Sequence, residues 1–226
     1  MPPFLGQGLC QGIKDVYNLH WKLDGVLKGK YADKVLDTYS DERISIVKSV
    51  TETAIKHGGV IGTQNKYVAL IRDTLLTVAR IFPKLLSFFD FYHPWQITNG
   101  LIDKSLYPNK ANGIVISQPN LDLKVDNKSF DQYIGYNFAL IVFDQNEKLL
   151  NDIKALESSK IFEDNIYLIN KDSPFNEDSN FIKWKRDNKI SAVIIRPDRH
   201  VYGCCDNESM ITKVDELNKK LISELT

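Results

Sequence analysis

The sequence has little of what marks redox and metal proteins. Its 226 residues include three cysteines, Cys10, Cys204 and Cys205. Adjacent cysteines pair only in a rare strained ring, and Cys10 lies far from the other two in sequence, so we expect reduced thiols. No Cys-x-x-Cys pair opens a helix, and the four histidines lack the spacing of a zinc site. We therefore expect neither a redox pair nor a bound metal.

An excess of charge and a long apolar run are also missing. Lys plus Arg and Asp plus Glu are both 29, so no field of one sign would attract a nucleic-acid backbone. No apolar stretch approaches the ~18 to 20 residues of a membrane span, and the first residues do not form a signal peptide. We expect a cytoplasmic protein that binds neither nucleic acid nor membrane.

The first part of the chain is patterned as helices. Apolar residues recur at helical spacing from Leu9 to Leu27, and Gly29 supplies a stop. A short helix is expected over 32–39. Ser40, followed by three charged residues, is typical of an N-cap that begins another helix, which should end at 57–59.

Residues 65–89 are helical in pattern again, with a break expected at Pro83. Aromatic side chains gather over 82–95, which favours a core between domains, although a substrate or oligomer surface is an alternative. Turn-forming residues concentrate between 93 and 128 and leave room only for short extended pieces such as 114–117. This turn-rich stretch is expected to hold a domain boundary.

Strands and helices alternate in the second part of the chain. Short buried apolar runs and amphipathic stretches follow one another, and a turn over 197–200 makes a hairpin of the last two strands. A βαβ unit, a second helix, a hairpin and a terminal helix describe a small thioredoxin-like α/β domain. The expected strands are 138–143, 161–169, 191–196 and 201–204, and the expected helices are 147–157, 179–188 and 207–225.

The loop before the first helix is the most specific segment. Two prolines and two glycines in residues 2–8 make it stiff, and the backbone N–H groups of Gly8, Leu9 and Cys10 would point into open space from the helix N-terminus. Such groups form an anion or oxyanion site. The simpler alternative is that proline and glycine only start a helix.

Residue identity adds to this pattern. Residues Pro2 to Leu23 contain Pro-Pro-x-x-Gly-Gln-Gly, then Gly-Ile-Lys-Asp, then Asn-Leu-x-Trp-Lys-Leu. In this order they resemble the flavin-closing segment of FAD-dependent aromatic-ring monooxygenases, the group of phenol hydroxylases and 3-(3-hydroxyphenyl)propionate hydroxylases. Leu36 to Arg43 is similar to the family's Leu-x-x-Tyr-x-x-Glu-Arg. Gly113 to Pro119 resembles its linker into a thioredoxin-like domain, and Arg196-Pro197-Asp198 resembles a hairpin of that domain.

The resemblance implies an α/β protein in which the mainly helical C-terminal part of a flavin hydroxylase FAD/substrate domain precedes a small thioredoxin-like domain. The helical part would span 1–112, a linker 113–130 and the thioredoxin-like domain 131–226. A complete member would carry roughly 250 to 300 further residues N-terminal to this sequence, from ordinary domain sizes. In agreement, no Gly-x-Gly-x-x-Gly follows a strand, so the dinucleotide-binding fingerprint is absent.

The resemblance also implies an FAD site. Leu9 and Cys10 would direct their N–H groups at the O2 edge of the flavin, the helix dipole would stabilise negative charge there, and prolines would wall the ring. In such enzymes NADH or NADPH reduces FAD, and oxygen is transferred to a phenolic ring. The residues expected to bind FAD are Pro2, Pro3, Gly6, Gln7, Gly8, Leu9 and Cys10.

Two hypotheses follow from the sequence. The first is an FAD-dependent, NAD(P)H-consuming monooxygenase of a phenolic compound, present as a C-terminal fragment, with no catalytic side chain identified. The second is a catalytically inert remnant, or a dimerisation or interaction module. A homodimer is an expectation from the family alone.

Overall fold

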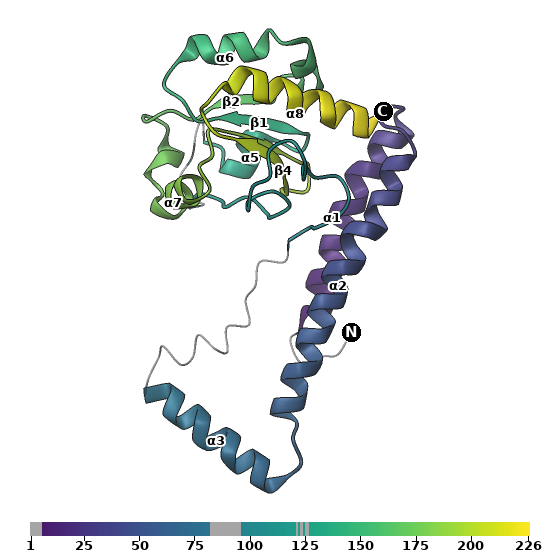
Figure 1. Cartoon of the computed structure of the whole chain (residues 1–226), viewed down its shortest axis with the longest axis vertical. Coiled ribbons are helices and arrows are strands. Elements are labelled where there is room, and N and C mark those ends of the chain that lie inside the picture. The colour runs from purple at the N-terminus through teal and green to yellow at the C-terminus, as the bar shows by residue number, and fades with distance from the viewer. Residues whose placement is uncertain (1–5, 82–95, 121, 123, 125–126) are drawn as a thin grey trace.

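The computed structural model describes residues 6–81, 96–120, 122, 124 and 127–226. Figure 1 shows a helical arm that projects from a small α/β domain. The arm consists of α1 (Gln7–Leu27) and α2 (Lys34–Ile61), which pack against each other, while α3 (Lys66–Ile81) turns away from the far end of α2. The α/β domain lies at the end of the arm where α1 ends and α2 begins.

A four-stranded sheet of order β2-β1-β3-β4 forms the centre of the α/β domain. Strand β1 (Ala139–Val142) is parallel to β2 (Ile166–Leu168) and antiparallel to β3 (Ala192–Ile195), which is antiparallel to β4 (Val201–Cys205). Every residue of β1, β3 and β4 is buried, as expected for strands that are covered on both faces.

Helices cover both faces of the sheet. Alternate residues along the strands belong to two separate apolar cores. On one face pack α6 (Glu147–Lys154), the 3-10 helix η3 (Glu157–Phe162) and α8 (Met210–Leu225). On the other face pack α5 (Phe130–Ile134), the 3-10 helix η4 (Pro174–Glu177) and α7 (Ser179–Asp187). The fold is the small thioredoxin-like α/β sandwich that the sequence predicts.

The arm differs from prediction at Ser40. Residues 34–61 form one continuous helix, so the expected break and N-cap at Ser40 are wrong. No proline or glycine interrupts this stretch before Gly58, and the helix ends only at Gly62. Helix α3 is described as far as Ile81, and the break expected at Pro83 and the aromatic residues of 82–95 lie outside the described residues.

The strand predicted over 161–169 is also shorter than expected. Only Ile166–Leu168 is extended, because Phe162 ends η3 and is fully buried in the core as part of that helix. The other predicted strands and helices of the domain differ from prediction only in their ends, whereas α5, η3 and η4 are helices that the sequence does not predict.

The turn-rich segment 96–117 lies along the edge of the sheet. Gly113 donates its N–H to Val201 O at 2.8 Å, Ile116 donates to Arg199 O at 2.9 Å, and Val115 forms an isolated antiparallel bridge with His200. Gly113 has φ 80, and a Cβ there would lie 2.1 Å from the carbonyl oxygen of Ile97, so only glycine fits. The division between 112 and 113 stays a prediction.

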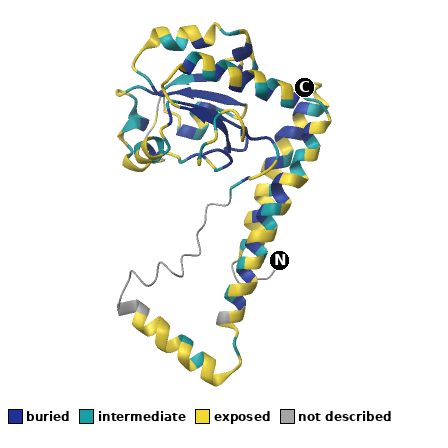
Figure 2. Ribbon diagram, in the orientation of Figure 1, coloured by how far each residue is buried: buried dark blue, intermediate teal, exposed yellow. Residues whose placement is uncertain are grey.

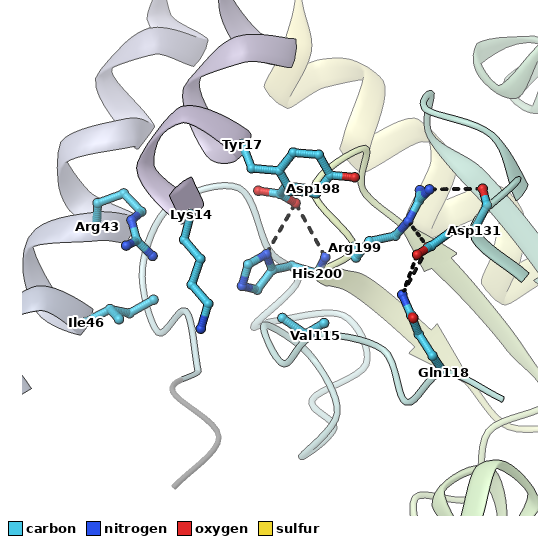
Figure 3. A pocket seen from close by; sticks show the side chains of 10 residues that line it. All are labelled: Lys14, Tyr17, Arg43, Ile46, Val115, Gln118, Asp131, Asp198, Arg199 and His200. Carbon is cyan, nitrogen blue, oxygen red and sulfur yellow. Dashed lines mark hydrogen bonds and ion pairs between the residues drawn. The ribbon is translucent and has the colours of Figure 1, made fainter. Parts of the chain in front are cut away.

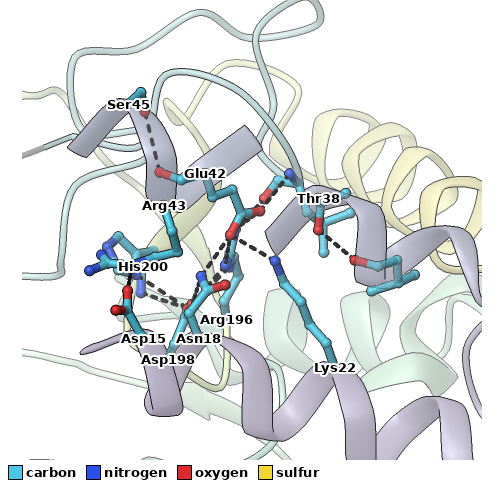
Figure 4. Close-up of polar contacts among 12 residues, drawn as sticks. Asp15, Asn18, Lys22, Thr38, Glu42, Arg43, Ser45, Arg196, Asp198 and His200 are labelled. Atoms are coloured by element: carbon cyan, nitrogen blue, oxygen red, sulfur yellow. Dashed lines mark hydrogen bonds and ion pairs between the residues drawn. The ribbon is translucent and has the colours of Figure 1, made fainter. Parts of the chain in front are cut away.

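A buried ionic cluster fastens the arm to the sheet (Figure 4). We call it the Glu42 cluster, after the α2 carboxylate that is 0% exposed at its centre. Arg196 donates to Glu42 Oε1 and Oε2 at 2.8 and 2.7 Å, and Lys22 Nζ donates to Oε2 at 2.9 Å. Arg196 also donates to both oxygens of Asp198, at 3.0 and 2.7 Å, and Asn18 donates to Glu42 and Asp198. Two cations and two carboxylates therefore balance in a site that water does not reach.

The charges inside the cluster overcome the cost of burial. Burial alone would raise the pKa of Glu42, but Arg196, Lys22 and Asn18 lower it from 4.5 to about 2. In the same way Arg196 and His200 hold the pKa of Asp198 well below its usual range despite burial. Glu42 and Asp198 are thus both ionised in the folded protein at neutral pH.

Glu42→Gln tests the cluster through the pH dependence of stability. Removing one charge of a buried pair should lower the free energy of unfolding by about 3 to 5 kcal/mol at pH 7. Because the folded-state pKa of Glu42 lies below its ordinary value, its contribution is complete above pH 4.5 and is lost as the pH falls towards about 2. Urea unfolding of both proteins over this range should show the two stabilities converging.

Glu163→Gln is the matched control, since Glu163 pairs with Lys30 on the surface with 61% of its side chain exposed. It should change the stability by less than about 1 kcal/mol. A difference between Glu42→Gln and the parent that does not change with pH would contradict an ionised Glu42.

Candidate functional site

The first turn of α1 is open, as the sequence predicts. Gly6 is the N-cap of α1 in the left-handed conformation, with φ 60 and ψ 13, and no side chain caps the helix. Leu9 is 77% exposed, and Cys10 is an exposed free thiol. No described residue accepts a hydrogen bond from the N–H groups of Gly8 or Leu9, so the positive end of the helix faces open space.

The residues expected to bind FAD are only partly described. Gly6 to Cys10 lie together at the start of α1, whereas Pro2 and Pro3 lie outside the described residues. Their role towards FAD stays a prediction.

Helix α1 buries a polar stripe and exposes an apolar one. Gln11, Asn18 and Lys22 are buried, whereas Ile13 and Val16 are 61% and 67% exposed. Figure 2 shows buried and exposed residues side by side along the helical arm. Apolar residues at helical spacing predict this helix, but they do not lie on the side of the helix that packs against the rest of the described chain. An exposed apolar stripe of several residues is typical of a contact surface. The apolar hollow on this side of α1 is lined by Gly8, Leu9, Gly12, Ile13, Val16 and Tyr17.

Residues of α2 hold the polar stripe of α1 at successive turns. Arg43 donates through Nε to Asp15 Oδ1 at 2.6 Å and through Nη2 to Gln11 Oε1 at 2.8 Å. The next two turns of α1 are held by Glu42, through Asn18 and Lys22. These contacts fix the start of α1, and with it the open first turn, relative to α2 and the sheet.

Three of the segments that carry the resemblance thus meet in space. The Asn-Leu-x-Trp-Lys-Leu segment supplies Asn18 and Lys22, the Glu-Arg pair supplies Glu42, and the Arg-Pro-Asp hairpin supplies Arg196 and Asp198. The sequence reveals these residues as motif members, yet it gives no sign that they contact one another.

A cavity of about 240 Å³ lies beside the Glu42 cluster, between the arm and the α/β domain (Figure 3). Its wall combines apolar side chains with three cations and two carboxylates. Asp131 accepts from Arg199 Nε at 2.6 Å, and Asp198 Oδ1 lies 3.3 Å from His200 Nδ1. The lining residues are Lys14, Tyr17, Arg43, Ile46, Val115, Gln118, Asp131, Asp198, Arg199 and His200.

None of the residues expected to bind FAD lines this cavity. Its lining comes from five places in the chain, which is why the pattern along the sequence does not reveal it. His200 is buried in its wall. Arg43 pairs with the carboxylate of Asp15, and Arg199 pairs with the carboxylate of Asp131.

The described cysteines and histidines show no catalytic grouping. Cys204 and Cys205 are buried and unpaired on β4, and burial raises the pKa of the Cys205 thiol to about 12. Within the described ranges no three His, Cys, Asp or Glu side chains could hold a metal ion. Among the helices that the structure describes, none has the length and apolar character to cross a bilayer.

Comparison with known proteins gives matches along both parts of the chain. The family profile described as FAD binding domain matches residues 1–54, and the profile described as HcaD C-terminal domain matches residues 113–220. A 3-(3-hydroxy-phenyl)propionate/3-hydroxycinnamic acid hydroxylase of Mycolicibacterium smegmatis is 33% identical over 66% of this chain and 28% of its own length. The enzyme of the same name from Burkholderia cenocepacia is 29% identical over 92% of this chain and 42% of its own length.

Solved structures share the fold. The flavin-dependent monooxygenase PieE, in complex with FAD and substrate, superimposes with a TM-score of 0.64 at 18% identity over 99% of this chain and 46% of its own. OxyS anhydrotetracycline hydroxylase from Streptomyces rimosus gives a TM-score of 0.62 at 19% identity over 98% of this chain and 42% of its own.

The chain spans 28% to 42% of the length of these curated relatives. The matches to both profiles agree with the resemblance carried by the loop, the Glu-Arg pair and the hairpin. By sequence and fold, the chain belongs to the FAD-dependent aromatic-ring monooxygenases of the phenol hydroxylase and 3-(3-hydroxyphenyl)propionate hydroxylase type and resembles their C-terminal part.

Proposed function

We propose that this protein takes part in the FAD-dependent, NAD(P)H-consuming hydroxylation of a phenolic compound in the cytoplasm. The observation that carries the proposal is the open first turn of α1, which lies within the segment that matches the FAD binding domain profile. When bound, FAD would supply the chemistry, because it takes electrons from NADH or NADPH and activates oxygen.

The residues of this turn fit the edge of a flavin. A Cβ on Gly6, Gly8 or Gly12 would meet no atom within 4 Å, so a planar ring has room to approach the backbone closely. The N–H groups of Gly8 and Leu9 would donate to the pyrimidine oxygen of the ring, whereas the N–H of Cys10, the fourth residue of α1, is at the first position that bonds within the helix. The helix dipole would stabilise negative charge at that oxygen. Arg43, through Gln11 and Asp15, holds the turn in place for these contacts.

The exposed apolar stripe of α1 indicates how the site would be completed. We propose that it packs against the polypeptide that carries the dinucleotide-binding and substrate-binding sheet of such enzymes. The relatives are more than twice as long as the region that this chain matches, so they contain further chain able to cover it. A dimer of two copies of this chain through the same stripe is the alternative that the experiments below separate.

The first experiment tests FAD binding. The purified chain should lack flavin absorbance near 450 nm, and co-expression with the N-terminal part of the Mycolicibacterium smegmatis relative should give a yellow complex. Gly6→Ala should weaken FAD binding about tenfold, because a Cβ strains the left-handed N-cap and crowds the ring edge. Gly29→Ala is the matched control, since Gly29 at the other end of α1 has φ 67 and equally open space.

A complex that forms but stays colourless with added FAD would refute the FAD proposal and leave the inert remnant. Equal losses in Gly6→Ala and Gly29→Ala would show that the effect is one of stability and not of the flavin site.

The second experiment tests the apolar stripe. Ile13→Glu should abolish association with the N-terminal part of the relative in size-exclusion chromatography, because a charge would be buried in the contact. The free energy of unfolding of the chain itself should change by less than about 0.5 kcal/mol, since Ile13 is 61% exposed.

Leu106→Glu, at a partly exposed leucine in the 96–120 segment beside α8, should leave the association unchanged. If Ile13→Glu dissociates a dimer of this chain and has no effect on the relative, the stripe is a dimer interface and the proposed contact is wrong.

A further inference from the structure

We propose that Asn99 is a site of self-catalysed deamidation, which converts its side-chain amide to a carboxylate next to the backbone that contacts the Glu42 cluster. The turn-rich segment contains two Asn-Gly pairs, Asn99-Gly100 and Asn112-Gly113. In both pairs the glycine has no side chain to hinder attack by its backbone nitrogen on the preceding asparagine. The structure distinguishes the two pairs. This inference does not depend on the proposed function, because the site lies outside α1.

The reaction needs no partner other than water. The backbone nitrogen of Gly100 bonds to Cγ of Asn99 and loses its proton to solvent, and the Cγ–Nδ2 bond breaks to release ammonia, which takes up a proton. Water then opens the resulting ring at one of two bonds. Cleavage between this nitrogen and Cγ gives aspartate. Cleavage between the nitrogen and the backbone carbonyl carbon gives isoaspartate, in which the main chain runs through the former side chain.

Asn99 and Gly100 are suited to this attack. Asn99 is exposed and lies in a bend outside any helix or strand. The N–H of Gly100 donates to no acceptor among the described residues, so no hydrogen bond holds its proton. Lys104 Nζ donates to Asn99 Oδ1 at 2.7 Å. This oxygen becomes negative as the nitrogen attacks, and a positively charged donor at that oxygen stabilises the charge.

The second pair is locked by the fold. Asn112 is 4% exposed, and its Nδ2 donates to the carbonyl oxygens of Asp103 and Tyr107 at 2.9 and 3.0 Å. The N–H of Gly113 donates to Val201 O at 2.8 Å, so the nitrogen that would attack is already engaged. Attack would break these hydrogen bonds at the edge of the sheet, and the loss of buried hydrogen bonds raises the barrier. Asn112 therefore keeps its amide while the protein stays folded.

The modification reaches the Glu42 cluster through the backbone. Gly100, with φ 94, packs so closely on Glu42 that an added Cβ would lie 2.4 Å from Glu42 Cγ. The N–H of Leu101 donates to Glu42 Oε1 at 2.9 Å, and its carbonyl oxygen accepts from Arg196 Nη1 at 2.9 Å. Isoaspartate lengthens the main chain by one atom directly before these contacts. The added atom displaces the Leu101 hydrogen bonds, so the modified chain fastens the arm less firmly.

Incubation of the purified full chain in mildly alkaline buffer tests the proposal, with peptide mass spectrometry as the readout. The peptide with Asn99 should gain the mass of one deamidation at least about ten times faster than the peptide with Asn112. In urea the two peptides should convert at similar rates, because unfolding removes the hydrogen bonds that protect Asn112. Chromatography against synthetic peptides identifies isoaspartate among the products.

Two variants test the part played by Lys104. Lys104→Met should slow the conversion of Asn99 at least about threefold in the folded protein, because the donor to Oδ1 is then absent, and should have no effect in urea. Lys110→Met removes the same charge from another exposed position of the segment and should convert as the parent does.

Thermal unfolding tests the consequence for the arm. Protein aged until Asn99 is converted should melt at least about 2 °C below fresh protein. Asn99→Asp has the new charge without the longer main chain and should melt with the fresh parent, since Asn99 is exposed. Asn99→Gln, whose longer side chain closes a ring far more slowly, should keep its melting temperature during the same incubation.

The proposal is overturned if Asn99 keeps its amide, if Asn99 and Asn112 convert at the same rate in the folded protein, or if Lys104→Met converts as fast as Lys110→Met. Aged protein that melts like fresh protein after conversion of Asn99 would refute the link to the Glu42 cluster.

Discussion

The carboxylate of Glu42 is shared by the arm and the α/β domain, and the arrangement of the rest follows from it. It accepts hydrogen bonds from Lys22 and Asn18 of α1 and from Arg196, which directly follows β3. It also accepts a hydrogen bond from the N–H of Leu101 in the segment that connects the arm to the α/β domain. An unpaired charge in that place would be costly, because Glu42 has no access to water. Any movement of α1, α2 or the hairpin that breaks one contact therefore leaves a buried charge without its partner. This is a strong reason for the arm to take one position.

Packing around the cluster strengthens this constraint. Trp21 is buried against Phe138 at the start of β1, with ring centroids 5.3 Å apart, and the Arg196 guanidinium lies 5.4 Å from the centroid of the Trp21 ring. The motif tryptophan thus joins the apolar core of the sheet to the ionic cluster. The open first turn of α1 and the cavity beside Arg43 are both positioned by this rigid junction.

Much of the fold can be predicted from the sequence, because local patterns decide it. The apolar run of β1, the turn over 197–200 and the amphipathic run of α8 are each readable in a few consecutive residues. The orientation of α1 cannot be predicted in this way, since periodicity identifies an apolar stripe without saying what covers it. At Ser40 a side chain suited to a cap lies inside a helix, because Glu42 and Arg43 make tertiary contacts there. The cavity cannot be predicted from the sequence, because its residues are distant along the chain and come together only through the cluster.

The separation of the cluster residues along the chain has a consequence for the order of folding. Glu42 and Arg196 are 154 residues apart, and the N–H of Ala32 bonds to the carbonyl of Leu225 in the last turn of α8 at 2.7 Å. Contacts between such distant residues form late, since a long loop must close first. During synthesis, α1 and α2 would leave the ribosome long before the hairpin and α8 that receive them. The start of α1 would therefore reach its final position only after α8 has been made.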